Sequence, residues 1–252
     1  MVTGTENLLG EFIGTTVLLV FGCGVCANLT LEKSKGQASG WVNIAIGWGF
    51  AVTLGVFTAT TLGAPQGDLN PAVTFGKMLV GIYTFPQFLM TSLVQILGGI
   101  LGATIVWLAY LPHWAATKDP AAKLGVFCTA PAIRNYPSNF ISEFIATLLL
   151  VFLIIAFGTK GNVYDPEGNT FGLSTLGPVP ITYVIVALGM SLGGTTGYAM
   201  NPARDLAPRI AYAICPIKDK RDPDWAYSWV PVLGPVLGGA VAGLCGIWLM
   251  SL

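Results

Sequence analysis

The sequence predicts an all-α membrane protein in which six transmembrane helices and two re-entrant half-helices form an inverted repeat. Three observations lead to this prediction: a shortage of charge, a series of long apolar runs, and an internal duplication. Of the 252 residues, 54% are hydrophobic and only 10% are charged, whereas a soluble domain carries about 25% charged residues. The formal net charge of zero also argues against a nucleic-acid partner, which needs a basic surface.

Six long runs of the chain contain no Asp, Glu, Lys or Arg, and each predicts a membrane span. A helix needs about 20 mainly apolar residues to cross the hydrocarbon core. The runs show no strict alternation of apolar and polar residues, so a β-barrel is not expected. We place the spans near residues 8–29, 41–62, 86–111, 140–158, 179–197 and 228–250.

The chain repeats itself at a nearly constant offset. Residues 11–15 (EFIGT) return as residues 143–147 (EFIAT), and Gly98 and Gly102 return as Gly234 and Gly238. Each half holds three spans, so the second half must lie upside down relative to the first, and the functional site of such repeats usually lies at the midplane. We therefore expect one transmembrane domain over 1–252, built from repeats at approximately 1–125 and 135–252. The spaced glycines should allow close helix packing.

Two shorter segments, 63–80 and 194–214, do not fit the count of spans, and each contains Asn-Pro-Ala. These motifs are Asn70, Pro71, Ala72 and Asn201, Pro202, Ala203. Asn is a good N-cap and Pro is favoured at the first helical position. Each segment therefore predicts a loop that enters the membrane and a short helix that begins at the proline. Irregular backbone is tolerated at membrane depth only where it is buried or lines a cavity, which indicates a pore or a binding site.

Residues 67–74 and 197–205 resemble the paired signature loops of the aquaporin family. Asp205, directly after Arg204, resembles the glycerol-conducting aquaglyceroporin branch. The resemblance implies a passive channel for glycerol, other small uncharged solutes and water, which excludes ions and protons. It also implies a multi-pass homotetramer in the lipid bilayer of the cell membrane.

The resemblance further implies a selectivity filter formed by Trp48, Gly189, Tyr198 and Arg204. Tyr198 departs from the Phe common in the family, and Asp68 departs from the usual His before the first Asn-Pro-Ala. At Gly189, the lack of a side chain is expected to give the filter width. No catalytic residue, cofactor or metal is expected.

The chemistry of these residues fits uncharged solutes. A solute that enters a narrow pore loses hydrogen bonds to water, and Asn70, Asn201 and Arg204 can replace them. The positive ends of both half-helices and the charge of Arg204 should repel cations. Glu11 and Glu143 are expected to hold the re-entrant loops, with proton coupling as the alternative. For Asp205 we expect structural support.

Three rival functions remain open, as does the orientation. The rivals are a water-selective pore, an ion-coupled secondary transporter and a structural junction protein with a closed pore. The family resemblance places both termini in the cytoplasm and the filter near the outer mouth. The positive-inside rule favours the reverse orientation, because the orientation implied by the resemblance puts most of the cations outside. The outer cations would be Lys33, Lys35, Lys118, Lys123, Arg134, Lys218, Lys220 and Arg221, and the inner ones Lys77 and Lys160.

Overall fold

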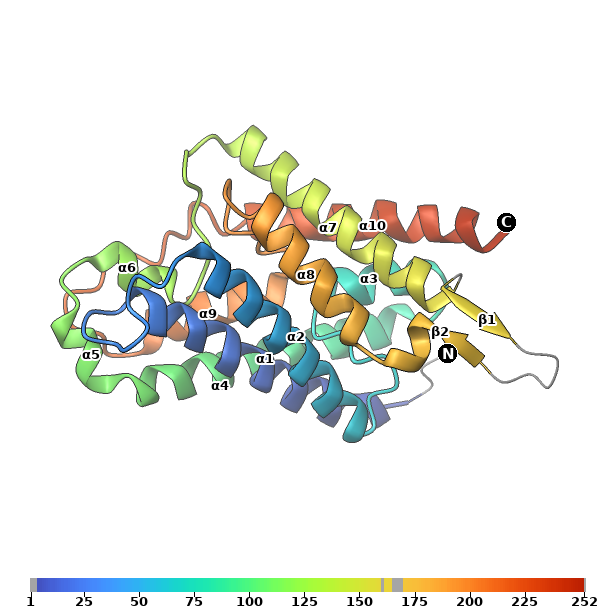
Figure 1. Ribbon diagram of the computed structural model, residues 1–252, viewed down its shortest axis with the longest axis horizontal. Helices are drawn as coiled ribbons and strands as arrows, with labels where there is room; N and C mark the ends of the chain where they lie inside the picture. Colours follow the sequence, from blue (N-terminus) through green and yellow to red (C-terminus); the bar gives the residue numbers. More distant parts are fainter. Residues whose placement is uncertain (1–3, 160, 165–169, 252) are drawn as a thin grey trace.

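The computed structural model describes residues 4–159, 161–164 and 170–251, and this part of the chain is a bundle of helices (Figure 1). Five helices are long and apolar enough to cross a membrane. They are α1 (Glu6–Thr30), α2 (Trp41–Thr61), α4 (Phe85–Ala109), α7 (Tyr136–Thr159) and α10 (Val230–Ser251). These helices correspond to five of the six predicted spans.

The fifth predicted span forms a shorter helix than expected. Helix α8 (Val179–Ser191) has 13 residues, which is about 20 Å at 1.5 Å per residue. The prediction of 179–197 is wrong at its C-terminal end. Gly193 and Gly194 follow the last turn, and the backbone from there runs back into the bundle toward Asn201 without helical structure. Two glycines remove the steric preference that would continue a helix.

The two Asn-Pro-Ala segments each form a short helix, as the sequence predicts. Helix α3 (Pro71–Leu79) and helix α9 (Pro202–Ile214) begin at the two prolines. Figure 1 shows both lying among the longer helices. The side-chain oxygens of Asn70 and Asn201 accept hydrogen bonds from Ala72 N and Ala203 N, at 2.9 Å in each case. Each half-helix therefore has the expected N-cap.

Small elements that the sequence analysis did not predict close the two ends of the bundle. Helices α5 (Leu111–Ala116) and α6 (Pro120–Gly125) lie at one end, which we call the filter end (Figure 1). The antiparallel strands β1 (Asn162–Tyr164) and β2 (Thr170–Gly172), followed by the 3₁₀ helix η1 (Leu173–Leu176), lie at the other, the hairpin end. The start of α1 and the end of α10 also lie at the hairpin end.

Glycines allow equivalent helix contacts in the two repeats. A Cβ atom at Gly98 of α4 would lie 2.2 Å from the carbonyl oxygen of Phe12 on α1. A Cβ atom at Gly238 of α10 would lie 2.5 Å from the carbonyl oxygen of Phe144 on α7. Both separations are too short for any side chain, so the predicted close packing of backbones is confirmed.

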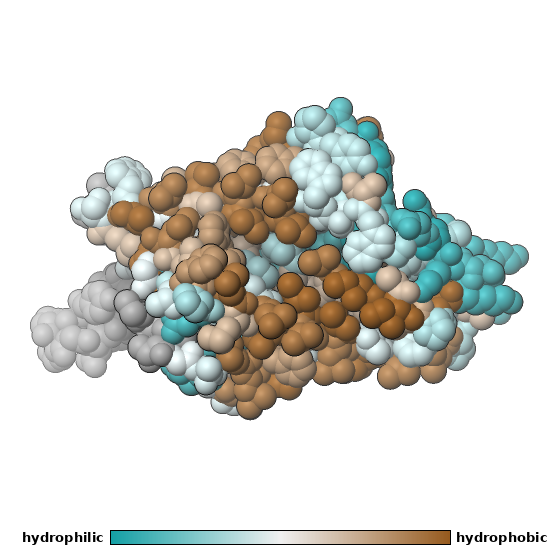
Figure 2. All heavy atoms as spheres, turned by 180° about the vertical axis from the view of Figure 1, so that it is seen from behind, coloured by the Kyte–Doolittle hydropathy of each residue, from teal (hydrophilic) through white to brown (hydrophobic). Residues whose placement is uncertain are grey.

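The outer surface of the bundle is apolar over its middle. Figure 2 shows hydrophobic atoms across the central part of one face and hydrophilic atoms gathered at one end. Large apolar side chains such as Phe21, Phe50 and Leu93 are exposed by half or more. Such a surface suits contact with lipid tails or with other membrane subunits.

Candidate functional site

The two half-helices meet through their capping asparagines. Asn70 Nδ2 donates to the carbonyl of Met200, and Asn201 Nδ2 donates to the carbonyl of Leu69, both at 2.8 Å. Each asparagine thus caps its own helix and binds the loop of the other repeat. One N–H of each amide remains for a solute, because an amide nitrogen carries two. The positive ends of the two helix dipoles therefore meet at the centre of the bundle.

The loops that precede the asparagines have unusual backbone geometry. Leu69 and Met200 have φ of 54° and 50°, and Tyr198 has φ of 39°. Residues other than glycine rarely adopt this left-handed region, and it persists only where the surroundings enforce it. Here the conformation directs the carbonyls of Leu69 and Met200 at the opposite asparagines. The two loops therefore fix each other.

Two buried carboxylates hold these loops in the same way. Glu11 accepts hydrogen bonds from the backbone N–H groups of Asp68 and Leu69, at 2.7 and 2.8 Å, and from Gln95 Nε2 at 2.9 Å. Both carboxylates are fully buried. Glu143 accepts from Ala199 N at 3.0 Å, Met200 N at 2.9 Å and Thr196 Oγ1 at 2.7 Å. Each carboxylate therefore ties two loop amides to a long helix.

A narrow cavity runs past the paired asparagines toward the filter end. It has a volume of about 60 Å³, several times the roughly 10–15 Å³ that one water needs. Polar groups occupy one part of its wall and aliphatic side chains the rest. The residues that line it include Trp48, Asn70, Tyr198, Asn201, Arg204, Leu18, Val52, Ile181 and Ile185.

Arg204 and Trp48 form the most distinctive contact of this cavity. The guanidinium carbon of Arg204 lies 3.9 Å from the centroid of the Trp48 ring, a cation–π distance. Gly22 on α1 makes room for the indole, because a Cβ there would lie 2.2 Å from the ring. Among the described residues, no protein group forms a hydrogen bond or ion pair with the Arg204 guanidinium, although the residue is only 8% exposed. Its N–H groups remain available to whatever occupies the cavity.

Gly189 lies against Tyr198 and is not among the residues that line the narrow cavity. A Cβ at Gly189 would lie 2.8 Å from both Cζ and the hydroxyl oxygen of Tyr198. The ring of Tyr198 therefore fills the space beside Gly189 that was expected to give the filter width. Any side chain at Gly189 would displace the ring of Tyr198, which lines the narrow cavity.

Asp205 is the centre of a saturated polar network at the filter end. Thr129 donates from both N and Oγ1 to Asp205 Oδ2 at 2.7 Å, and Arg209 binds Asp205 Oδ1 at 2.7 and 2.9 Å. Arg209 also donates to the carbonyls of Pro223, Asp224 and Thr129. Asp205 is thus paired with Arg209 and leaves Arg204 free.

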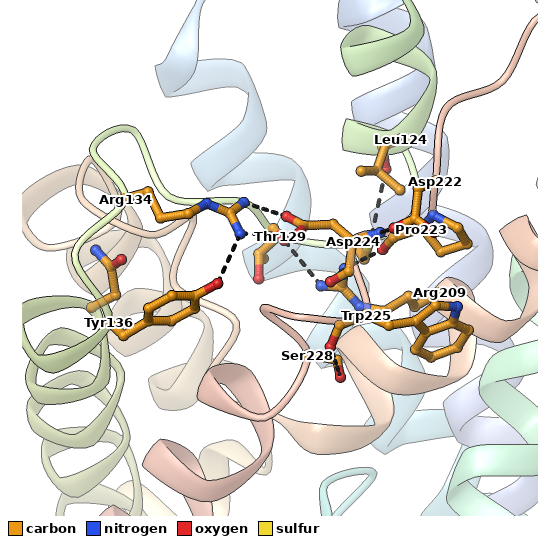
Figure 3. A network of polar contacts seen from close by, with 12 residues as sticks. Leu124, Thr129, Arg134, Tyr136, Arg209, Asp222, Pro223, Asp224, Trp225 and Ser228 are labelled. Carbon is orange, nitrogen blue, oxygen red and sulfur yellow. Dashed lines mark hydrogen bonds and ion pairs between the residues drawn. The ribbon is translucent and has the colours of Figure 1, made fainter.

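The rim of this network contains a second ion pair. Arg134 binds both carboxylate oxygens of Asp224 (Figure 3), and its guanidinium lies 5.2 Å from the centroid of the Tyr227 ring. The hydrogen bond from Arg134 is the main cause that lowers the pKa of Asp224 below its ordinary value of 3.8. The same pair raises the pKa of Arg134.

A wider cavity of about 360 Å³ continues toward the hairpin end. Both cavities are lined by Val52, Asp68, Val73, Ile154 and Ile181, so the two adjoin. Lys77 of α3 lines only the wider one, and its ammonium lies 2.5 Å from Asp68 Oδ1. Together the cavities describe a path past both Asn-Pro-Ala motifs.

Comparison with known proteins identifies the family. The model of the major intrinsic protein family matches residues 2–245. The chain belongs to the major intrinsic protein family.

Among relatives in this family, glycerol uptake facilitator protein 3 of Lactiplantibacillus plantarum is 52% identical over 94% of this chain and 94% of that protein. The probable glycerol uptake facilitator protein of Thermotoga maritima is 44% identical over 96% of this chain and 98% of that protein. The X-ray structure of the aquaglyceroporin from Plasmodium falciparum superposes with a TM-score of 0.80 at 28% identity, covering 95% of this chain and 94% of that one. The chain is therefore a multi-pass membrane protein with the fold of this family.

Several residues that shape the site were missed by the sequence analysis. Trp41 donates from Nε1 to the Gly189 carbonyl at 2.7 Å and packs edge-on against Tyr198, with ring centroids 5.9 Å apart. Arg209 neutralises Asp205, and Gln95 supports Glu11. Arg209 lies four residues after Asp205, a spacing that favours a helical ion pair, so this partner had a sequence signal. For Trp41 and Gln95 no such signal exists, because their partners are distant in the chain.

The described residues contain no group of three or more His, Cys, Asp or Glu side chains placed to hold a metal ion. The five cysteines are all free thiols, and four of them are buried. The charged groups that line the two cavities are the Arg204 guanidinium, the Lys77 ammonium and the Asp68 carboxylate.

Proposed function

We propose that this protein is a passive channel for glycerol and other small uncharged solutes, with water also passing. One observation carries the proposal: a buried arginine stacks on a tryptophan in a narrow cavity and keeps its donors unused. The names of the relatives, which are glycerol uptake facilitators, support the same solute class. Since members of this family act as membrane channels, no catalytic role is proposed.

The walls of the narrow cavity match the two sides of a glycerol molecule. Trp48 and Tyr198 offer apolar ring surface, and burying each CH₂ group returns about 0.8 kcal/mol. Arg204 and the amides of Asn70 and Asn201 offer donors for the hydroxyl groups, each of which costs about 1–3 kcal/mol if left unpaired.

The same arrangement accounts for the exclusion of cations and protons. The two helix N-termini direct partial positive charge at the centre, each about half an elementary charge. Arg204 adds a full charge that no described carboxylate neutralises directly, because Asp205 is occupied by Arg209. Both amide nitrogens at the centre are donors, so they disfavour a donor such as a hydronium ion there.

The tetramer, the orientation and the cell-membrane location are further parts of the proposal. The exposed apolar side chains can contact lipid or neighbouring subunits, and each subunit would contain its own path. We propose that the filter end faces outward and the hairpin end faces the cytoplasm. Native mass spectrometry of the purified protein in detergent should report four copies, and labelling of an engineered cysteine in α5 should occur from outside the cell.

Flux measurements on reconstituted vesicles test the proposal against its rivals. We expect glycerol and water to move down their own gradients. Neither flux should saturate, and neither should depend on an ion gradient. Water flux without glycerol flux would indicate a water-selective pore. Uphill, ion-dependent glycerol movement would indicate a secondary transporter, and the absence of both fluxes would indicate a structural protein.

The electrostatic role of Arg204 has its own test. Replacing Arg204 with Val removes the charge and the unused donors but leaves the Asp205 network intact. We expect a folded protein whose proton and cation conductance rises at least about tenfold, which corresponds to about 1.4 kcal/mol. A folded Arg204→Val protein with background conductance would contradict this role. Arg134→Gln, which removes a cation outside the path, serves as the control.

A further inference from the structure

The hairpin-end cavity contains a charged side chain that the proposed function does not use. Lys77 is the one charged residue of α3, and its side chain is only 10% exposed. Lys77 helps to line the 360 Å³ cavity. A lysine that served only to balance the C-terminal end of α3 could direct its flexible chain into water. Here the ammonium is held beside the path.

Asp68 fixes the position of that ammonium. Its Oδ1 atom pairs with Lys77 Nζ at 2.5 Å, and its side chain is completely buried. The backbone N–H of Asp68 is bound by Glu11, which holds the loop that carries it. Asp68 lines both cavities and Lys77 lines the wider one, so the carboxylate holds the ammonium at the wall of the path. A lysine without this partner would sample many rotamers.

The ammonium of Lys77 has donors to spare. A protonated lysine carries three N–H groups, and within the described part of the chain Asp68 is the only hydrogen-bond partner of Nζ. The other two N–H groups can bind oxygen atoms in the cavity. Arg204 is in the same state on the other side of the paired asparagines, where its guanidinium also keeps its donors.

We propose that Lys77, held by Asp68, is a solute-binding residue at the hairpin-end mouth of the path and favours polyols over water. Its free N–H groups would donate to a hydroxyl oxygen of a solute as the solute leaves or enters the narrow cavity. The nearby wall supplies apolar contact through Val73 and Ile154, which line both cavities. Water gains less from this site, since it has no carbon groups to place against that wall.

The proposal rests on the proposed glycerol conduction, and the double variant Asp68→Asn/Lys77→Met tests it. The double variant removes the charges as a pair and keeps the approximate volumes, so no buried charge is left unpaired. We expect glycerol flux to fall about fivefold while water flux changes by less than about twofold. A fivefold change is what the loss of one hydrogen bond of about 1 kcal/mol produces.

Three further variants give the test its controls. Lys77→Arg keeps a cation with free donors and should retain at least half of the glycerol flux. Lys77→Gln keeps an N–H donor for Asp68 but loses the charge, so it should lower the glycerol-to-water ratio even if the double variant does not fold. Arg134→Gln/Asp224→Asn removes an ion pair outside the path and should leave the ratio unchanged.

The outcomes separate this inference from the proposed function. If the wild-type protein conducts no glycerol, the proposed function is wrong. If it does, and the folded Lys77 variants keep the wild-type ratio, Lys77 does not meet the solute and the inference is wrong. An equal fall in glycerol and water flux would also overturn it, because that result indicates a structural role for the ion pair.

Discussion

The two half-helices share the same backbone supports but use their charges in opposite ways. Each has an asparagine cap, and each loop is held by a buried glutamate through two amides. In the second repeat, Asp205 is saturated and the cation next to it, Arg204, is free. In the first repeat, Asp68 holds Lys77 directly, and Asp68 Oδ2 has no partner among the described residues. The duplicated parts therefore hold the backbone, and the charged side chains are arranged differently in the two repeats.

The largest expected effect concerns the saturated carboxylate. Asp205→Asn leaves the buried Arg209 without its ion-pair partner and places an amide donor among donors. Breaking a buried pair on one side typically costs about 3–5 kcal/mol. Thermal unfolding in detergent should show this loss, whereas Asp68→Asn should cost less, because Lys77 can turn toward the cavity. Equal losses of stability in Asp205→Asn and Asp68→Asn would contradict the difference between the two ion pairs. Lys218→Ala, at an exposed position, serves as the neutral reference.

Glu11 and Glu143, which support the loops of the two repeats, should lose similar amounts of stability when they are replaced. Glu11→Gln and Glu143→Gln each replace an acceptor of three hydrogen bonds with a group that can no longer accept them all. We expect each to cost about 2–3 kcal/mol and to lower the folded yield without changing the glycerol-to-water ratio. A well-folded variant that loses flux only under a pH gradient would instead favour proton coupling.

A smaller effect is expected at Gly189, which lies against the ring of Tyr198. Gly189→Ala places a methyl group 2.8 Å from the Tyr198 ring and 3.0 Å from the Ala45 Cβ, so the ring must move toward the cavity. We expect glycerol flux to fall several-fold, with a smaller fall in water flux, because water needs less width. The exposed Gly194→Ala, at which a Cβ meets nothing within 4 Å, is the control. Unchanged glycerol flux would mean that the Tyr198 ring does not limit passage.

The smallest effect concerns the rim pair of the second repeat. Because the pKa of Asp224 is lowered in the folded protein, its contribution to stability is present above the unfolded pKa. That contribution is lost as the pH falls below 3.8 toward the folded value. Arg134 is 40% exposed, so solvent screening limits the effect to at most about 1 kcal/mol. The acid-induced fall in melting temperature should be shallower in Asp224→Asn. An identical fall in melting temperature in both proteins would show that the Arg134–Asp224 pair does not contribute to the acid response.

The cations at the filter end show why the positive-inside count is a weak argument here. Lys220 Nζ donates to the carbonyls of Tyr212, Ala213 and Cys215 at the end of α9, at 2.7 to 2.9 Å. Lys123 is 1% exposed and donates to the Lys218 carbonyl. Lys220 thus completes the end of α9 and Lys123 binds the loop that follows it, so neither is a free loop charge. Lys160 lies outside the described residues.

Much of this protein follows from the sequence alone, because the signals involved are local or repeated. A long apolar run predicts a membrane span. Asn-Pro-Ala predicts a capped helix start, because Asn is a good N-cap and Pro is favoured at the first helical position. The repeated EFIGT and EFIAT segments placed Glu11 and Glu143 in matching positions. The short α8 was missed, because the run without charged residues continues past its last turn and only the glycines mark its end.

Only the tertiary structure decided which charges are paired and which are free. Asp205 lies beside both Arg204 and Arg209, and the choice between them depends on Thr129 and the carbonyls near residue 223, which are far away in the chain. The placement of Tyr198 in the space beside Gly189, and of Trp41 against both, likewise joins residues up to 148 positions apart. Local sequence cannot specify such contacts, because side-chain partners across a packed interior depend on how all the helices come together.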